Sequence, residues 1–258
     1  GVIVPGAQFF SAGGRRLFGV FSPARERADA ALLLCPPMLH EQIRSHRLWA
    51  LLAHALAGQG ISTLRFDYAG SGDSAGDSRT LDLGEAVIDA EYALAELRAA
   101  TSSLPIHVLG VRLGGFVAAE LARREGLPVL LWQPFEQGEQ AWSELQARDL
   151  QERRSTRRFP FLRPGRTRVV AEHSVMGFAL QERFANRLIS ARSPFDATQP
   201  YVLDADAEVD RCHRHTVDVA LPMALSDWAG WIDITGPFPP SDVEHTALRM
   251  AARMRGRT

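Results

Sequence analysis

Short apolar segments alternate with segments of helical periodicity along most of this chain. The apolar segments cover residues 30–35, 61–68, 106–111 and 129–132, and the helical ones cover residues 43–56, 83–99 and 114–124. Continuous short apolar runs are typical of parallel strands that are buried on both faces. The alternation therefore predicts an α/β protein with a mostly parallel, doubly wound sheet of about eight strands and right-handed crossovers.

The two ends of the chain extend this pattern, and one segment interrupts it. Residues 8–11 and 16–21 favour a strand pair joined by Gly13 and Gly14. Residues 137–175 are polar and rich in arginine and proline, and we interpret them as an inserted cap that divides the core into residues 1–136 and 176–258. The later part predicts helices over 178–189 and 243–253, and strands over 201–203 and 231–234.

Composition excludes several classes of function. The formal net charge of −1 gives no overall field for nucleic acid or a membrane surface, and no apolar run approaches a membrane span. All 29 basic residues are arginine, so no lysine can form a Schiff base. Two distant cysteines, no visible signal peptide and no metal-ligand spacing favour a cytoplasmic protein without metal or cofactor.

The segment 105–120 is the most specific motif of the chain. It predicts a strand, a sharp turn and a helix, with Gly110, Gly114 and Gly115 around the turn. This is the spacing of the nucleophile elbow, in which close backbones require glycine and the central residue is held strained at the end of the sheet. That central residue is Arg112 instead of serine. The alternative is a tight strand-to-helix turn without a site.

Two further motifs resemble the α/β-hydrolase superfamily. Residues 32–38 look like the strand that leads to the oxyanion loop, and residues 65–74 look like the superfamily's D-x-x-G-x-G-x-S loop. More narrowly, three stretches resemble the second hydrolase-like protein associated with the exosortase A system: Pro36-Pro37 with Glu41, Ser45 and Arg47, then residues 72–77, and then the elbow at 110–114. That resemblance implies that arginine at the elbow is a feature of the subgroup.

Arginine at position 112 closes the usual covalent route. A guanidinium stays protonated and cannot attack a carbonyl carbon as an activated serine does. Three alternatives remain open. Arg112 could bind a carboxylate or phosphate of a ligand, it could pair with an acid of the protein, or an activated water could be the nucleophile.

Glu41 and Asp73 are the candidate acids beside Arg112. Each follows a predicted strand, and ligand sites in such sheets form outside the carboxyl ends of the strands. We therefore predict that at least one of them lies within salt-bridge reach of Arg112. Glu41 could instead pair with a helix dipole, and Asp73 could have only a turn role.

The order of a hydrolase triad supplies the remaining candidates. The acid would be Asp204 or Asp206 after the strand at 201–203, and the histidine would be His245, for which a position on the helix surface is the alternative. The backbone N–H groups of Met38 and Leu113 could form an oxyanion site. Cys35 is a possible nucleophile away from the elbow, although buried cysteines are usually inert. The local group of Cys212, His213 and His215 does not have zinc spacing.

The predicted cap carries seven arginines and no acid between residues 153 and 168. This segment could be a solvated flap, or it could receive an anionic partner such as an acyl carrier, a coenzyme A thioester or an acidic saccharide. Three functions stay open. The chain could bind an acyl- or carboxylate-bearing small molecule, either without turnover or with non-covalent acid–base chemistry by Glu41, Asp73 or His245. It could instead be an inactive scaffold of an exopolysaccharide or exosortase-type system, or an active esterase, thioesterase or peptidase with a displaced nucleophile.

Overall fold

An eight-stranded sheet forms the centre of the molecule in a computed structural model that describes residues 4–171, 173–205, 216–228 and 238–256. Strands β3, β4, β5, β6, β9 and β10 run parallel to one another, as the sequence predicted for most of the sheet. Strands β1 and β2 form the predicted strand pair, and β2 joins the edge of the sheet antiparallel to β4. In spatial order the strands are β1 (Gly6–Ala12), β2 (Arg15–Ser22), β4 (Ile61–Phe66), β3 (Ala30–Cys35), β5 (Ile106–Val111), β6 (Val129–Trp132), β9 (Tyr201–Ala205) and β10 (Val219–Leu221).

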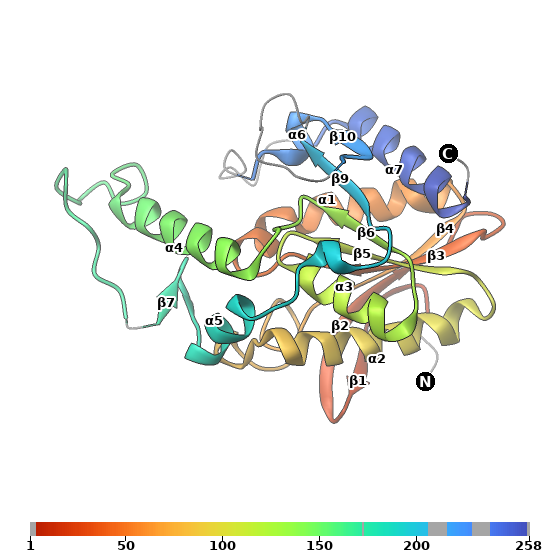
Figure 1. Cartoon of the computed structure of the whole chain (residues 1–258), viewed down its shortest axis with the longest axis horizontal. Helices are drawn as coiled ribbons and strands as arrows, with labels where there is room; N and C mark the ends of the chain where they lie inside the picture. Colours follow the sequence, from red (N-terminus) through yellow and green to blue (C-terminus); the bar gives the residue numbers. More distant parts are fainter. Residues whose placement is uncertain (1–3, 172, 206–215, 229–237, 257–258) are drawn as a thin grey trace.

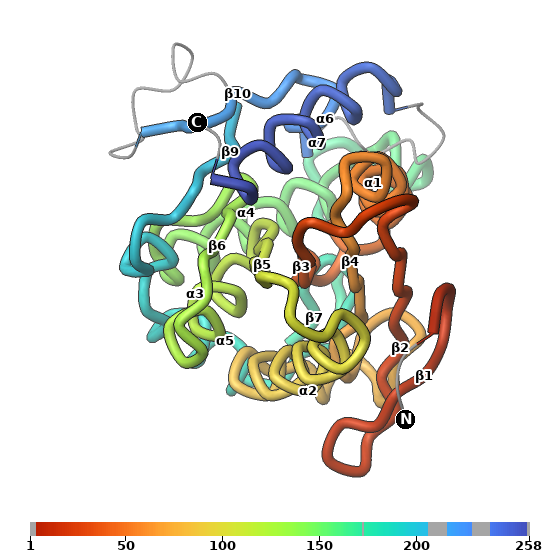
Figure 2. The backbone as a smooth tube through the Cα atoms, turned by 90° about the vertical axis from the view of Figure 1, so that its right-hand side faces the viewer, coloured from red at the N-terminus to blue at the C-terminus, as the bar shows by residue number. Residues whose placement is uncertain are grey.

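Helices cover both faces of the sheet. Helices α1 (His40–Gly58) and α7 (Pro240–Met254) lie on one face, and α2 (Leu83–Thr101) and α3 (Gly114–Glu125) lie on the other (Figures 1 and 2). Strand β3 is apolar throughout because both of its faces are buried. Ala31, Leu33 and Cys35 pack into the core on the α2 and α3 side, whereas Ala30, Leu32 and Leu34 pack against α1 and α7.

Several element bounds differ from the sequence prediction. Helix α1 begins at His40, not Ile43, so Glu41 lies in its first turn. Strand β4 ends at Phe66, not Tyr68. The predicted helix at 178–189 begins only at Glu182 in α5 (Glu182–Ile189). The sequence reading missed β10, and the strand predicted over 231–234 lies outside the described residues.

The region predicted as a cap contains a long helix and a small hairpin. Helix α4 (Gly138–Arg154) extends past the edge of the sheet, and β7 (Ser174–Val175) and β8 (Phe178–Ala179) lie near it (Figure 1). The buried carboxylate of Asp149 on α4 accepts a hydrogen bond from the backbone N–H of Met176, at 2.8 Å, in the turn of that hairpin. Acids of α4 also neutralise part of the arginine-rich segment, since Asp149 pairs with Arg153 and Glu152 pairs with Arg158.

Short elements complete the chain between these parts. They are two single turns at Ser78–Thr80 and Pro194–Asp196, and helix α6 (Met223–Ser226). None of the helices in the described part of the chain is long and apolar enough to cross a membrane.

Candidate functional site

The turn between β5 and α3 has the backbone geometry of an elbow. Arg112 adopts a φ of 52°, in the left-handed region that side chains rarely occupy. A Cβ at Gly110 would lie 2.6 Å from the Cβ of Ala118, and one at Gly114 would overlap the backbone oxygens of Cys35 and Pro36. The glycines flanking position 112 therefore permit the close approach of strand, helix and the neighbouring β3 loop that the sequence predicted.

Two other strand ends beside the elbow show the same unusual conformation. Leu39, shortly after β3, has a φ of 59°, and Gln133, directly after β6, has a φ of 43°. Strands β3, β5 and β6 are adjacent in the sheet, so these three residues follow neighbouring carboxyl ends. Strained non-glycine residues are held only where surrounding structure fixes them, and they often mark functional sites.

The side chain of Arg112 is 13% exposed and contacts two carboxylates. Its Nε lies 3.2 Å from Glu41 Oε1, and its Nη2 lies 2.9 Å from Glu144 Oε1 on α4. Nη1 lies 3.5 Å from the carbonyl oxygen of Gln133. The predicted ion pair between Arg112 and an acid at the sheet edge is therefore present, with Glu41 as the acid.

Aromatic rings enclose the same guanidinium. The Cζ of Arg112 lies 4.2 Å from the ring centre of Phe135 and 5.7 Å from that of Trp228. Gln133 fixes Trp228, because its Oε1 accepts a 2.7 Å hydrogen bond from the indole N–H, and its Nε2 donates to the carbonyl of Ser226. These contacts hold the arginine in one position.

Burial and charge act in opposite directions on this ion pair. Burial raises the pKa of Glu41, and the adjacent Arg112 partly offsets that rise. Burial acts to lower the pKa of Arg112, but Glu41 and Glu144 together raise it above the usual value for arginine. Arg112 is therefore a permanent cation, and its charge is already compensated by protein carboxylates.

A cavity of about 280 Å³ lies over this group. Its lining residues come from the start of α1, the elbow, the segment after β6, α4 and the segment after α6; they are His40, Glu41, Arg112, Phe135, Glu144, Leu145, Ala147, Arg148, Gln151 and Trp228. Two arginines and two glutamates line the cavity, so it carries no net charge when His40 is neutral. The space suits a small and largely uncharged group.

Asp73 does not join this group. It is exposed, and its backbone N–H donates a 3.0 Å hydrogen bond to Asp67 Oδ2. Gln42 donates to the other oxygen of Asp67 at 2.9 Å, and a Cβ at Gly72 would overlap the Asp67 carboxylate. Asp73 belongs to a turn held by Asp67 and lines a different cavity, which agrees with the turn role considered above.

Of the remaining triad candidates, Asp204 and His245 lie in the described part of the chain, and neither lines the Arg112 cavity. Asp204 is the fourth residue of β9 and is buried, and its Oδ1 accepts a hydrogen bond from the N–H of Ala205. His245 is an exposed residue of α7 and does not line the Arg112 cavity. Asp206, Cys212, His213 and His215 lie outside the described residues. Within the described residues, no group of His, Cys, Asp and Glu side chains could hold a metal ion.

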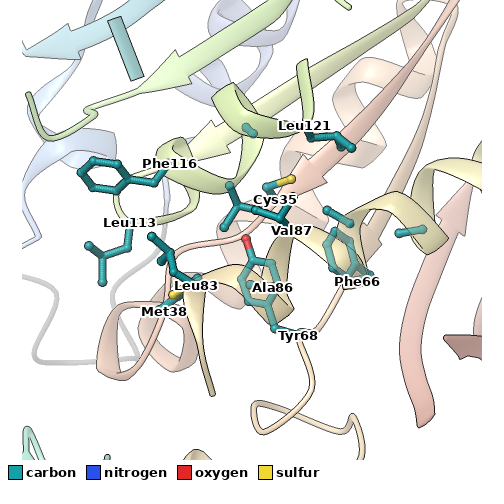
Figure 3. Packing of buried hydrophobic residues seen from close by; sticks show 14 of the residues in the cluster. Cys35, Met38, Phe66, Tyr68, Leu83, Ala86, Val87, Leu113, Phe116 and Leu121 are labelled. Carbon is teal, nitrogen blue, oxygen red and sulfur yellow. The ribbon is translucent and has the colours of Figure 1, made fainter. Parts of the chain in front are cut away.

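Met38 and Leu113, the two candidate oxyanion donors, have side chains in the buried cluster beneath the elbow (Figure 3). Their side chains are almost fully buried, so only their backbone groups could face a ligand. Cys35 belongs to the same cluster, where burial raises the pKa of its thiol. A protonated buried thiol is a poor nucleophile.

Sequence reasoning missed most of the residues that surround Arg112. Glu144, Phe135, Gln133 and Trp228 come from α4, from the segment after β6 and from the segment after α6. The only available signal was position, because Gln133 and Phe135 directly follow a predicted strand of the sheet. His40 was also missed, because the helix was predicted to begin later.

His40 gives the site a testable pH dependence. Burial, followed by repulsion from Arg44 and Arg148, lowers the pKa of His40 to about 3. The unfolded chain therefore binds a proton at His40 that the folded chain does not, so stability should be lost as pH falls below about 6.5. We expect urea unfolding to show a loss of up to about 1.4 kcal/mol per pH unit between pH 6.5 and about pH 4 that is missing in His40→Gln. If the free energy of unfolding depended on pH in the same way in the wild-type protein and in His40→Gln, the lowered pKa of His40 would be contradicted.

Comparisons with known proteins agree with this geometry at the level of the fold. The family model described as "Serine aminopeptidase, S33" matches residues 27–129, which is less than half of the chain. Among solved structures, Est1E from Butyrivibrio proteoclasticus, determined with bound ferulic acid, is 16% identical with a TM-score of 0.53, and the match covers 78% of each chain. The chain has the α/β-hydrolase fold.

Other similar structures cover a smaller part of the chain. An α/β serine hydrolase homologue from Coxiella burnetii is 21% identical with a TM-score of 0.45, over 52% of this chain and 64% of that one. A putative α/β hydrolase from Agrobacterium tumefaciens is 23% identical with a TM-score of 0.44, over 52% of this chain and 62% of that one. The match thus spans less than two thirds of either relative. No curated protein matches the sequence.

Proposed function

We propose that this protein binds an acyl- or carboxylate-bearing small molecule at the elbow and does not hydrolyse it through a covalent intermediate. The observation that carries the proposal is the state of Arg112, which stands at the strained turn between β5 and α3 with Glu41 and Glu144 on its guanidinium. No proton can be removed from this side chain near neutral pH, so it cannot form an acyl-enzyme.

The contacts of Arg112 argue for a positioning role instead of direct binding of a ligand carboxylate. An anion in the cavity would have to compete with two protein carboxylates that already neutralise the guanidinium. Through Glu144, Arg112 also links the elbow to α4, which we propose is the main helix of a cap spanning residues 137–175. The acyl part of a ligand would then lie against Phe135, Leu145 and Trp228 in this cavity, which carries no net charge.

The other hypotheses receive less support. Acid–base chemistry by Asp73 or His245 is disfavoured, since neither lines the Arg112 cavity. Nucleophilic attack by Cys35 is disfavoured by its complete burial. A scaffold role is favoured by the neutralised arginine, although a cavity of about 280 Å³ remains beside it. The resemblance to the exosortase-associated subgroup, in which arginine is expected at the elbow, also supports a function without serine chemistry.

Covalent labelling tests this proposal directly. A fluorophosphonate probe, which reacts with activated serine nucleophiles, should leave the protein unlabelled at concentrations that fully label an active serine esterase, and p-nitrophenyl acetate should be cleaved no faster than in buffer. Intact-mass spectrometry and absorbance measure the two outcomes. Cys35→Ala is the matched variant, because it removes the thiol that was considered above as a nucleophile away from the elbow. Stoichiometric labelling or steady turnover by the wild-type protein would overturn the proposal.

A further inference from the structure

A larger cavity of about 620 Å³ lies next to the Arg112 cavity. His40 lines both, so the two spaces adjoin at the start of α1. The larger cavity is bounded by α1, by the end of α4 with the segment after it, and by the β7–β8 hairpin; its lining residues of interest are Ile43, Arg44, Glu152, Arg157, Arg158 and Phe178. Nothing in the function proposed above uses this space.

Positive charge predominates in the larger cavity. Three arginines and one glutamate line it, which leaves an excess of two positive charges. His40 adds none near neutral pH, because its pKa is lowered to about 3 by burial and by the nearby arginines. Glu152 is shared between Arg148 and Arg158, so its single charge is already divided between two partners.

Arg44 is the least satisfied of these cations. Its Nη1 atom is buried and has no hydrogen-bond partner in the structure, and the Nδ1 atom of His40 is in the same state. Burial lowers the pKa of Arg44, and attraction to Glu152 offsets that fall only in part. Buried polar atoms are nearly always paired, and an unpaired buried donor is costly. Arg44 Nη1 is therefore a donor that an acceptor atom of a ligand could pair with.

One part of the cavity wall is apolar. Met176 and Phe178 of the hairpin region line it, together with Ile43 of α1, whose side chain is 57% exposed. An exposed isoleucine at the mouth of a charged cavity offers contact area to an apolar group. A ligand that fills the space would therefore carry an anionic group and an apolar body.

We propose that this cavity binds a phosphate monoester with an apolar substituent, its phosphate lying on Arg44, Arg157 and Arg158 and its substituent on Ile43 and Phe178. A phosphate monoester carries nearly two negative charges at neutral pH, which matches the excess of two positive charges; a carboxylate carries only one. Its oxygens accept several hydrogen bonds at once, as arginine forks require. The site stands apart from the chemistry of position 112 and goes beyond the function proposed above.

Calorimetric titration of the full chain at low salt tests this assignment with three probes: octyl phosphate, octanoate and inorganic phosphate. Octyl phosphate should bind more tightly than either of the other two. Arg44→Gln should weaken its binding by about 10-fold or more, which is typical of a lost hydrogen bond to a charged group. Arg47→Gln is the matched control, because Arg47 lies on the same helix, is exposed and does not line the cavity.

Each other outcome has a defined meaning. Octanoate binding as tightly as octyl phosphate would overturn the phosphate assignment, and inorganic phosphate binding as tightly would overturn the role of the apolar wall. Equal losses in Arg44→Gln and Arg47→Gln, or no binding of any probe at millimolar concentration, would overturn the site itself. Circular dichroism checks that Arg44→Gln is folded; if it is not, Arg157→Gln, at an exposed position of the same cavity, replaces it.

Discussion

Replacing Arg112 by methionine should lower the free energy of unfolding by about 3–5 kcal/mol at neutral pH, as measured by urea denaturation. The substitution removes the cation from a pair whose side chains are 13% and 10% exposed. Glu41 would then be a buried carboxylate without its cation, and such a charge costs far more than the intact pair contributes. The loss should shrink in acid, because a carboxyl with a raised pKa becomes protonated in the folded state and its burial penalty disappears.

Two variants separate this effect from a general disturbance of the elbow. Arg112→Met combined with Glu41→Gln should be clearly more stable than Arg112→Met alone, because the buried charge is then gone. Glu144→Gln should cost less than about 1 kcal/mol, since the side chain of Glu144 is 54% exposed and water solvates it without its partner. A double variant as unstable as Arg112→Met would show that Glu41 is not the source of the loss.

Gly114→Ala should destabilise the protein by about 4 kcal/mol or more. The new Cβ would lie closer than 3.0 Å to the carbonyl oxygens of Cys35 and Pro36, which are backbone atoms that no rotamer change can move. The elbow and the loop after β3 would have to separate. Differential scanning calorimetry of the purified variant measures the effect as a large fall in Tm.

The neighbouring glycine supplies the control for this substitution. A Cβ at Gly115 would lie 3.6 Å from the Cβ of Pro134, which is ordinary contact. Because alanine favours helix over glycine, Gly115→Ala should leave stability unchanged or raise it by up to about 1 kcal/mol. Similar losses in both variants would mean that the close approach at Gly114 is not specific to that position.

Most of the fold was predictable because its central strands carry an unambiguous signal. The predicted ranges of β3, β5 and β6 coincide with the observed ones, since each is a short apolar run covered on both faces and bounded by turn residues. Strand β10 has only three residues, one of them exposed, and such a segment gives no periodic pattern. The start of α1 was placed late because its first turn, His40 to Gln42, is polar by sequence although Glu41 and Gln42 are buried.

The candidate site was predictable only where strand order fixes it. Glu41 was expected near Arg112 because both follow the carboxyl ends of strands in one sheet, and the ion pair is present because those two strands are adjacent. Asp73 follows β4 at the same edge of the sheet, but the turn around Asp67 holds its backbone elsewhere. Glu144 and Trp228 reach the guanidinium from segments whose docking depends on tertiary packing, and no spacing in the sequence encodes it.

The two carboxylates that contact Arg112 differ in solvent exposure, because the side chain of Glu41 is 10% exposed and that of Glu144 is 54% exposed. The Nε edge faces Glu41 inside the core, whereas the Nη2 atom meets a side chain that water reaches freely. Dissolved ions therefore screen the Arg112–Glu144 pair, whereas they screen the buried Arg112–Glu41 pair much less. Raising the ionic strength should therefore weaken the contact between Arg112 and Glu144 of α4 more than the contact between Arg112 and Glu41.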